Sequence, residues 1–364
     1  MTTCVAYSVK LTNNSTFFGH AICLSPHEIM LPLPCDDQLW SAPTAEALQR
    51  VDQNLRSYGL KPLSFLNALR RILHGHTVRT HPWARKILMY GLITVGWHIN
   101  HRESMLTCFD TPRTSLDQER CRKLLVEAFD AWKDDFDDTL AAETLTGLPN
   151  SNLKIKRNFD DPQIIYFVAN LSLHANIVDF QMLAGSTRLL GRRVSTRDKA
   201  HAVARVKDWS RTESGRHAVF HAFKFLHAML VVPQTTFDNS SALNDKSGPN
   251  ITYSSRQDEL NYRPWIIFLA SLTIWAFTVA HNPSSRIEWP ETDVVDEQKK
   301  HSHIASYLTL YATRTPAAEL AQPKLEVGLI ELLDMLHGGY EDAENDLLIE
   351  AHDRFKECRD MLIR

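Results

Sequence analysis

Residues 263–280 form the stretch that most limits how this chain can fold. The segment RPWIIFLASLTIWAFTVA is apolar on nearly every side of a helix, and such a helix lies inside a protein or a membrane. It falls short of the roughly 20 apolar residues that cross a bilayer, and it carries Ser271, Thr273 and Thr278. We therefore expect a helix buried at the centre of a folded domain.

The partner of this helix is expected between Thr196 and Val231. Asp198 stands in the first turn of one helical segment, where a carboxylate accepts hydrogen bonds from free backbone amides, and Trp209 ends that segment. After residues 214–215, a second segment carries an apolar stripe with the helical period. The predicted fold class is therefore all-α, a multi-helix domain around buried central helices. The stripe consists of Ala218, Val219, Ala222, Phe223, Leu226, Met229 and Leu230.

The composition is that of an ordinary globular chain with a slight negative charge. Apolar residues make up 44% of the 364 residues, charged residues make up 23%, and the formal net charge is -3. A charge of that sign provides no overall attraction to nucleic acid or to anionic membranes. The first residues also lack the basic and apolar regions of a secretory signal peptide, so we expect a cytosolic or nuclear compartment.

Metal sites and covalent catalysis find little support in the sequence. Zinc fingers and disulfide frameworks need closely spaced cysteines, but no CxxC pair occurs, so we predict reduced thiols, no metal and no cofactor. His217 and His221 have a spacing that can hold zinc but lack the glutamate of an HExxH signature, so we expect them to pack and hydrogen-bond. Nucleophile elbows and phosphate-binding glycine loops are absent. The six cysteines are Cys4, Cys23, Cys35, Cys108, Cys121 and Cys358.

The chain is expected to consist of an extended arm followed by one helical body. Prolines punctuate residues 1–34, and we predict that Leu39 and Trp40 pin this arm to the body. Residues 35–364 are predicted to be helical, with a polar insert over about 234–256 that we expect to be mobile. No alternating segment is long enough to predict a sheet. Further helices are predicted over about 44–57, 62–73, 83–100, 116–140, 164–190 (with a break near Gly185), 301–313, 325–336 and 343–362.

Two arginines in the central segments have two open interpretations. Arg216 stands near Trp209, and Arg263 stands next to Trp265, so each guanidinium needs several hydrogen-bond partners when it is buried. In the structural interpretation, the arginines bond helix-end carbonyls and hold the central helices together. In the binding interpretation, Trp209, Arg216, Arg263 and Trp265 line a cavity that accepts an acidic effector.

A basic run between residues 192 and 211 is the best candidate for contact with nucleic acid. Its seven cations can form a stripe for phosphates. The run lacks interleaved aromatic residues and a helix-turn-helix pattern that would read bases. We therefore consider it a weak nucleic-acid or partner face, and the alternative is a solvated helix face partly paired with the acidic segment 130–138. The candidate face consists of Arg192, Arg193, Arg197 and Lys199, and Arg205, Lys207 and Arg211 complete the run.

The sequence DDFDD at residues 134–138 supplies an alternative from another class, a helical-pocket enzyme of the metal-dependent lyase or cyclase type. Asp134 and Asp138 are one helical turn apart, with Asp135 beside them, and they can share a divalent cation. The interpretation fails where these side chains point outward, as acidic faces on solvated helices do. Acidic charge near a helix C-terminus also predicts an early end of the helix or basic neighbours.

The central segments resemble a known family. The run DWSRTESGRHAVFHAFKFL followed by RPWIIFLASLTIWAF is similar to the core of the fungal-specific transcription factor domain, the regulatory region of many fungal zinc-finger transcription factors. Further similar segments occur in the expected order along nearly the whole chain. They are LPLPCDDQLWSAPTAEAL at residues 31–48, the WHINHRE helix ending near Glu103, IVDFQMLAGSTRLLGR at 177–192 and the terminal GGYEDAENDLLIEAHDRFKECRDML.

This resemblance implies an all-α regulatory domain of a nuclear RNA polymerase II transcription regulator. Such a domain acts through protein partners of the transcription machinery, other regulators or a small effector. Family members usually carry zinc fingers ahead of it, whereas here Met1 almost directly precedes the helical part. We therefore assign zinc to no residue and expect DNA contact only through a finger module absent from this chain. A trimmed gene product, a finger-less modulator and a domain recruited for another binding task all fit.

Overall fold

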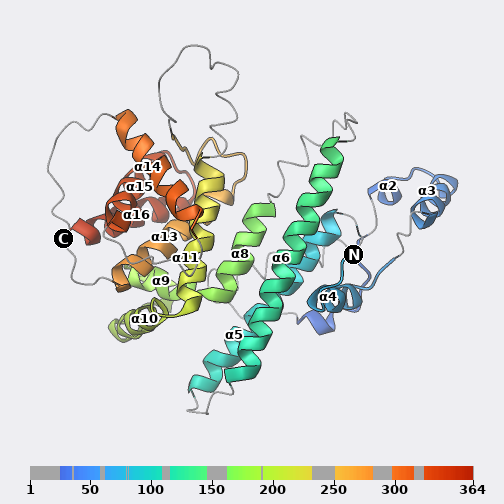
Figure 1. Cartoon of the computed structure of the whole chain (residues 1–364), viewed down its shortest axis with the longest axis horizontal. Coiled ribbons are helices and arrows are strands. Elements are labelled where there is room, and N and C mark those ends of the chain that lie inside the picture. Colours follow the sequence, from blue (N-terminus) through green and yellow to red (C-terminus); the bar gives the residue numbers. More distant parts are fainter. Residues whose placement is uncertain are drawn as a thin grey trace. The chain divides into compact units, whose positions relative to one another are not determined.

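The computed structural model is almost entirely helical in the part of the chain that it describes, which confirms the predicted all-α class (Figure 1). Among the described residues, strands occur only in one short hairpin. The chain forms two compact units, residues 1–153 and 154–364, which are described in turn. The described residues are 25–34, 37–57, 62–78, 80, 82–108, 115–145, 162–189, 192–231, 251–281, 297–314 and 324–363.

The first unit is built on the long helices α5 (Pro82–Cys108) and α6 (Ser115–Leu145), which pack on each other and on α4 (Phe65–Leu73). Ser64 begins α4, since its side chain accepts a hydrogen bond from the backbone amide of Asn67. A Cβ added at Gly91 of α5 would lie 2.8 Å from a ring carbon of Phe65. Glycine therefore permits the close approach of α5 to α4.

The segment before α4 is pinned by a different residue from the predicted one. The backbone amide of Leu33 donates to the carbonyl of Leu63 at 2.8 Å, and the Leu33 side chain is buried. Trp40 is 71% exposed, so the prediction that it anchors the arm is wrong. A hydrogen-bonded backbone and a smaller apolar side chain hold the segment instead. The short elements here are η1 (Pro26–Glu28), α2 (Asp37–Trp40) and α3 (Ala45–Ser57), and α3 has no buried residue.

Helix α13 (Arg263–His281) lies at the centre of the second unit, with every residue from Pro264 to Thr278 buried. By length and composition it is the one described helix that would be able to cross a membrane. Its burial among other helices instead marks it as a core helix, as predicted. Its packing against α11 confirms the predicted central pair. The helices in contact with it are α8 (Pro162–His174), α9 (Ile177–Leu183), α10 (Thr196–Trp209), α11 (Glu213–Leu226), α15 (Lys324–Gly339) and α16 (Asp346–Ile363).

The helix predicted over 164–190 is two helices. Asn176 interrupts it, because its side-chain oxygen accepts a hydrogen bond from the backbone amide of Val178 at 3.2 Å and so begins α9. Gly185, with φ +95°, lies just past the C-terminal end of α9. The chain then enters the hairpin of β1 (Arg188–Leu189) and β2 (Arg192–Arg193).

The end of the predicted mobile insert is packed in the structure. Ile251 is fully buried, and the backbone amide of Ser255 donates to the carbonyl of Gly339 at 2.8 Å. Residues 234–250, the rest of that prediction, lie outside the described residues. The remaining elements of the unit are η2 (His227–Val231), a π-helical turn that continues α11, and α14 (Glu297–Ala312).

Candidate functional site

Trp209 joins four helices of the second unit. Its indole nitrogen donates to the carbonyl of His174 at 2.7 Å, which satisfies a free carbonyl at the end of α8. Its ring lies 4.7 Å from the ring of Phe180 in α9 and 6.0 Å from that of Phe277 in α13, measured between centroids. Trp209 therefore supports the structural interpretation, because both its polar and its apolar parts have partners inside the unit.

Arg263 neutralises a buried carboxylate. Its Nε lies 2.8 Å and 2.9 Å from the two oxygens of Asp258, whose side chain is 1% exposed. Asp258 also accepts hydrogen bonds from the Tyr253 hydroxyl and the Leu260 backbone amide, each at 2.9 Å. The predicted bond to helix-end carbonyls is thus replaced by a charged pair at the start of α13, and an acidic effector would have to displace Asp258.

The four residues of the predicted cavity do not converge. Trp209 lies against Phe277, whereas Arg263 and Trp265 stand near the opposite end of α13. The helical rise places Trp265 and Phe277 about 18 Å apart along the axis. Arg216, in the first turn of α11, is partly buried and makes no ion pair with a described residue. The residue types suggested a binding site, but the sequence does not show which ends of the two helices lie together. The prediction assumed that the four side chains meet at one end.

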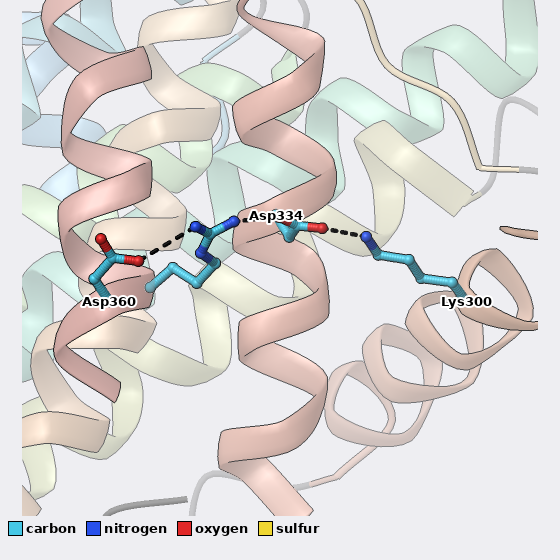
Figure 2. Close-up of polar contacts among 4 residues, drawn as sticks. Lys300, Asp334 and Asp360 are labelled. Atoms are coloured by element: carbon cyan, nitrogen blue, oxygen red, sulfur yellow. Dashed lines mark hydrogen bonds and ion pairs between the residues drawn. The ribbon is translucent and has the colours of Figure 1, made fainter. Parts of the chain in front are cut away.

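Three closing helices share a charged network that sequence reasoning missed. Asp334 of α15 pairs with Lys300 of α14 and with Arg359 of α16, and Arg359 also pairs with Asp360. Figure 2 labels Lys300, Asp334 and Asp360 of this network. The Arg359 Nη1 lies 2.5 Å from Asp334 Oδ1, and its Nη2 lies 3.3 Å from Asp360. Burial would raise the pKa of Asp334, but hydrogen bonds and positive charge from Lys300 and Arg359 lower it overall. The network therefore ties three helices together as an ion cluster.

A histidine pair lies close to this network. The rings of His337 in α15 and His352 in α16 are 4.1 Å apart between centroids. Burial, followed by the charges of His352 and Arg359, lowers the pKa of His337. The lowered pKa favours the neutral form of His337, whose ring packs on His352 at the α15–α16 contact.

The rings of His217 and His221 pack on different side chains, which agrees with the packing that the sequence predicts. The His217 ring stacks on His174 at 5.3 Å and lies 3.5 Å from Glu213, whereas the His221 ring meets Tyr166 edge-on at 5.6 Å. Burial, then the neighbouring imidazoles, lowers the pKa of His221 to about 3. Within the described residues, no group of three or more His, Cys, Asp or Glu side chains is arranged to hold a metal ion.

The aspartates of the enzyme alternative face outward. Asp134 and Asp138 are exposed on α6, while Trp132 and Phe136 turn inward, so these two carboxylates point away from the core and do not support the metal-binding alternative. Helix α6 continues past them to Leu145. The other part of the expectation, basic neighbours, is confirmed within the first unit. Asp135 pairs with Arg85 at 3.0 Å, and Asp137 pairs with Lys133.

The described side chains of the predicted basic face are exposed or partly exposed. Arg193 and Arg197 are exposed and Lys199 is partly exposed, while the side chain of Arg192 lies outside the described part. Arg205 does not belong to this surface group, because it pairs with the buried Asp179 through contacts of 2.6 and 2.8 Å. Sequence reasoning missed Arg188, which the hairpin places beside the face.

Tyr307 and Tyr311 of α14 form a second aromatic group that the sequence reasoning missed. Their rings lie 5.4 and 4.8 Å from the ring of Phe223 in α11. Neither hydroxyl has a hydrogen-bond partner among the described residues, and burial raises the pKa of both. Their spacing of four residues is the sequence signal, since it places both rings on one helical face.

Comparison with known families points to transcription. Residues 12–134 match the family described as "Fungal specific transcription factor domain". That match falls in the first unit and includes the predicted similar segment at 31–48 and the helix near Glu103. It does not include the central segments on which the sequence resemblance was built.

Two curated fungal proteins are similar over most of the chain. The nicotinate catabolism cluster-specific transcription factor of Emericella nidulans is 26% identical over 281 residues, covering 73% of this chain. The zinc finger protein klf1 of Schizosaccharomyces pombe is 23% identical over 264 residues, covering 71%. The chain spans 29% of the length of each relative. No solved structure matches.

Proposed function

We propose that this chain, which carries a match to the fungal specific transcription factor domain over residues 12–134, is the regulatory region of a fungal RNA polymerase II transcription regulator. The similarity to two fungal proteins, one of them a named transcription factor, is the observation that carries the proposal. An alignment over 73% of the chain extends past residue 134, so it involves the second unit as well.

The region acts through contacts with proteins or with a small effector. Its 364 residues contain no CxxC pair and have a net charge of -3, which does not favour DNA. One relative is named a zinc finger protein. By analogy, we assign DNA reading to a zinc-finger module outside these residues, and we place the protein in the nucleus. The outward aspartates of α6 support a role without catalysis.

An acidic effector would engage Arg216 rather than Arg263. The guanidinium of Arg263 is already bound to Asp258, whereas that of Arg216 has no ion pair among the described residues. Replacing Arg216 with Gln should leave the melting temperature unchanged and remove any effector response. A loss of folding in this variant would instead assign Arg216 a structural role.

The function is tested by co-purification from nuclear extract of a fungal host. The tagged chain is expected in the nucleus, together with subunits of the transcription machinery or with other regulators. A matched bait of equal size and charge from an unrelated helical protein gives the background. Exclusion from the nucleus, or recovery of no transcription component above that background, would overturn the proposal.

A further inference from the structure

The hairpin after α9 brings positive charges together. In its antiparallel register, Arg188 lies directly opposite Arg193. Side chains at directly opposed positions have Cβ atoms about 5 Å apart, and like charges there destabilise a hairpin. Arg197 and Lys199 follow in the first turn of α10. We call these four residues, Arg188, Arg193, Arg197 and Lys199, the hairpin basic face.

The hairpin basic face is not neutralised from within the described part of the chain. None of its four side chains forms an ion pair with a described residue, and the nearby carboxylates of Asp198 and Asp179 make contacts elsewhere. Asp198 accepts hydrogen bonds from the backbone amide and hydroxyl of Ser195, at 3.1 and 2.8 Å. Asp179 binds Arg205. Charge is therefore concentrated here although the chain as a whole is slightly acidic.

The segment that leads into the hairpin is attached to α16, which holds the backbone of the hairpin basic face in place. The Ser186 hydroxyl lies 3.4 Å from a carboxylate oxygen of Glu350, and Arg354 donates to the carbonyl of Ala184 at 3.4 Å. The backbone amide of Val194 donates to the carbonyl of Thr187 at 3.0 Å and closes the base of the hairpin. A surface ordered before binding loses less conformational entropy when a partner arrives.

We infer that the hairpin basic face binds an acidic segment of a partner protein. Three of its four cations are arginines, whose planar forks match carboxylates with paired hydrogen bonds. Nucleic acid fits less well, because residues 186–199 contain no aromatic side chain on which bases would stack. The inference rests on the proposed function, since it names the chemistry of the partner that the regulatory region contacts.

Fluorescence anisotropy with the full chain tests this inference. The probe is a short labelled peptide in which Glu alternates with Ser, compared with the same peptide carrying Gln in place of Glu. The Glu peptide is expected to bind more tightly, with an affinity that falls as salt rises. The double variant Arg188→Gln and Arg193→Gln should weaken its binding at least about tenfold.

A matched double variant controls for net charge. Lys207→Gln and Arg211→Gln remove two exposed positive charges at the other end of α10 and should change the affinity less than about twofold. Because the Arg188 and Arg193 charges repel each other, their removal should not lower the melting temperature. A lower melting temperature for that double variant would contradict the repulsion on which the inference is built.

Three results would overturn the inference. They are equal binding of the Glu and Gln peptides, equal losses in the two double variants, and tighter binding of a short duplex DNA that the Arg188 and Arg193 variant abolishes. The last result would assign the face to nucleic acid. Since the assay uses purified chain and no transcription readout, a negative result beside an active transcription reporter would reject the partner chemistry and leave the proposed function standing.

Discussion

Asp258 and Arg263 form a nearly buried ion pair where the chain enters its central helix. The carboxylate side chain is 1% exposed, the guanidinium side chain is 26% exposed, and their closest contact is 2.7 Å. Asp258 also receives two neutral hydrogen bonds, so its charge is satisfied from three directions. These contacts therefore hold residues 253–260 against the first residue of α13. Substitution of Asp258 measures how much they contribute to stability.

Replacing Asp258 with Asn should lower the free energy of unfolding by about 2–4 kcal/mol, because it leaves the Arg263 charge without its partner. Urea denaturation measures the change. Glu344→Gln is the control, since the Arg256–Glu344 pair is 63% and 77% exposed and such surface pairs contribute about 0–1 kcal/mol. Equal effects of the two substitutions would show that burial of the Asp258 pair does not matter.

His221 should make stability depend on pH. Its pKa is lowered from 6.5 to about 3, so the folded chain holds it neutral while the unfolded chain protonates it. Its contribution is complete above pH 6.5 and is lost as the pH falls from there toward about 3, with a slope of up to about 1.4 kcal/mol per pH unit. His221→Phe should flatten the pH dependence of the unfolding free energy, and exposed His201→Gln should not. An unchanged slope in His221→Phe would refute this.

Two glycines of α15 should respond in opposite ways to alanine. A Cβ at Gly328 would overlap the ring of Tyr307, whereas a Cβ at Gly338 would meet nothing within 4 Å. Gly328→Ala should therefore cost about 1–3 kcal/mol of unfolding free energy through overpacking. Gly338→Ala should be neutral or stabilise by up to about 1 kcal/mol. Thermal melting of the two variants compares them directly, and similar melting temperatures would contradict the close α14–α15 contact.

The network around Asp334 should show energetic coupling across α15 and α16. In a double-mutant cycle of Asp334→Asn and Arg359→Gln, we expect a coupling of about 1 kcal/mol, because the pair is only partly exposed. Since the pKa of Asp334 is lowered, this contribution is present above pH 3.8 and is lost as the pH falls below it. A coupling free energy that does not differ from zero would show that the Asp334–Arg359 pair does not stabilise the fold.

The central part of the fold was predictable because it depends on local periodicity. The apolar stripe around Phe223 and the all-round apolar segment around Trp275 predict two helices that contribute to the core, and the Phe223 and Trp275 side chains are both fully buried. Helix ends set by side-chain hydrogen bonds were harder. Asn176 divides α8 from α9 within a stretch whose helical period runs on without a break. Trp40 was predicted to be an anchor because large apolar side chains are often buried, but it is 71% exposed. Tertiary contacts, which the local sequence does not show, decide its burial.

The candidate sites were less predictable, since they depend on contacts between distant residues. Arg263 was recognised as a residue that needs partners, but the sequence did not identify Asp258 as the partner. Asp334 and Arg359 belong to separate helices, and nothing in either helix pattern links them. The basic run was visible in the sequence. The pairing register of the hairpin adds Arg188 to the basic face, and the ion pair with the buried Asp179 removes Arg205 from it.

The most direct test of the account is a tethered transcription assay in a fungal host. The chain is fused to a DNA-binding module from an unrelated protein, and transcription of a reporter carrying that module's site is compared with the module alone. We predict that the fusion changes reporter transcription, that Gly328→Ala diminishes the change and that Gly338→Ala preserves it. A folded fusion that occupies its site in the nucleus and leaves reporter transcription equal to that of the module alone would contradict the account.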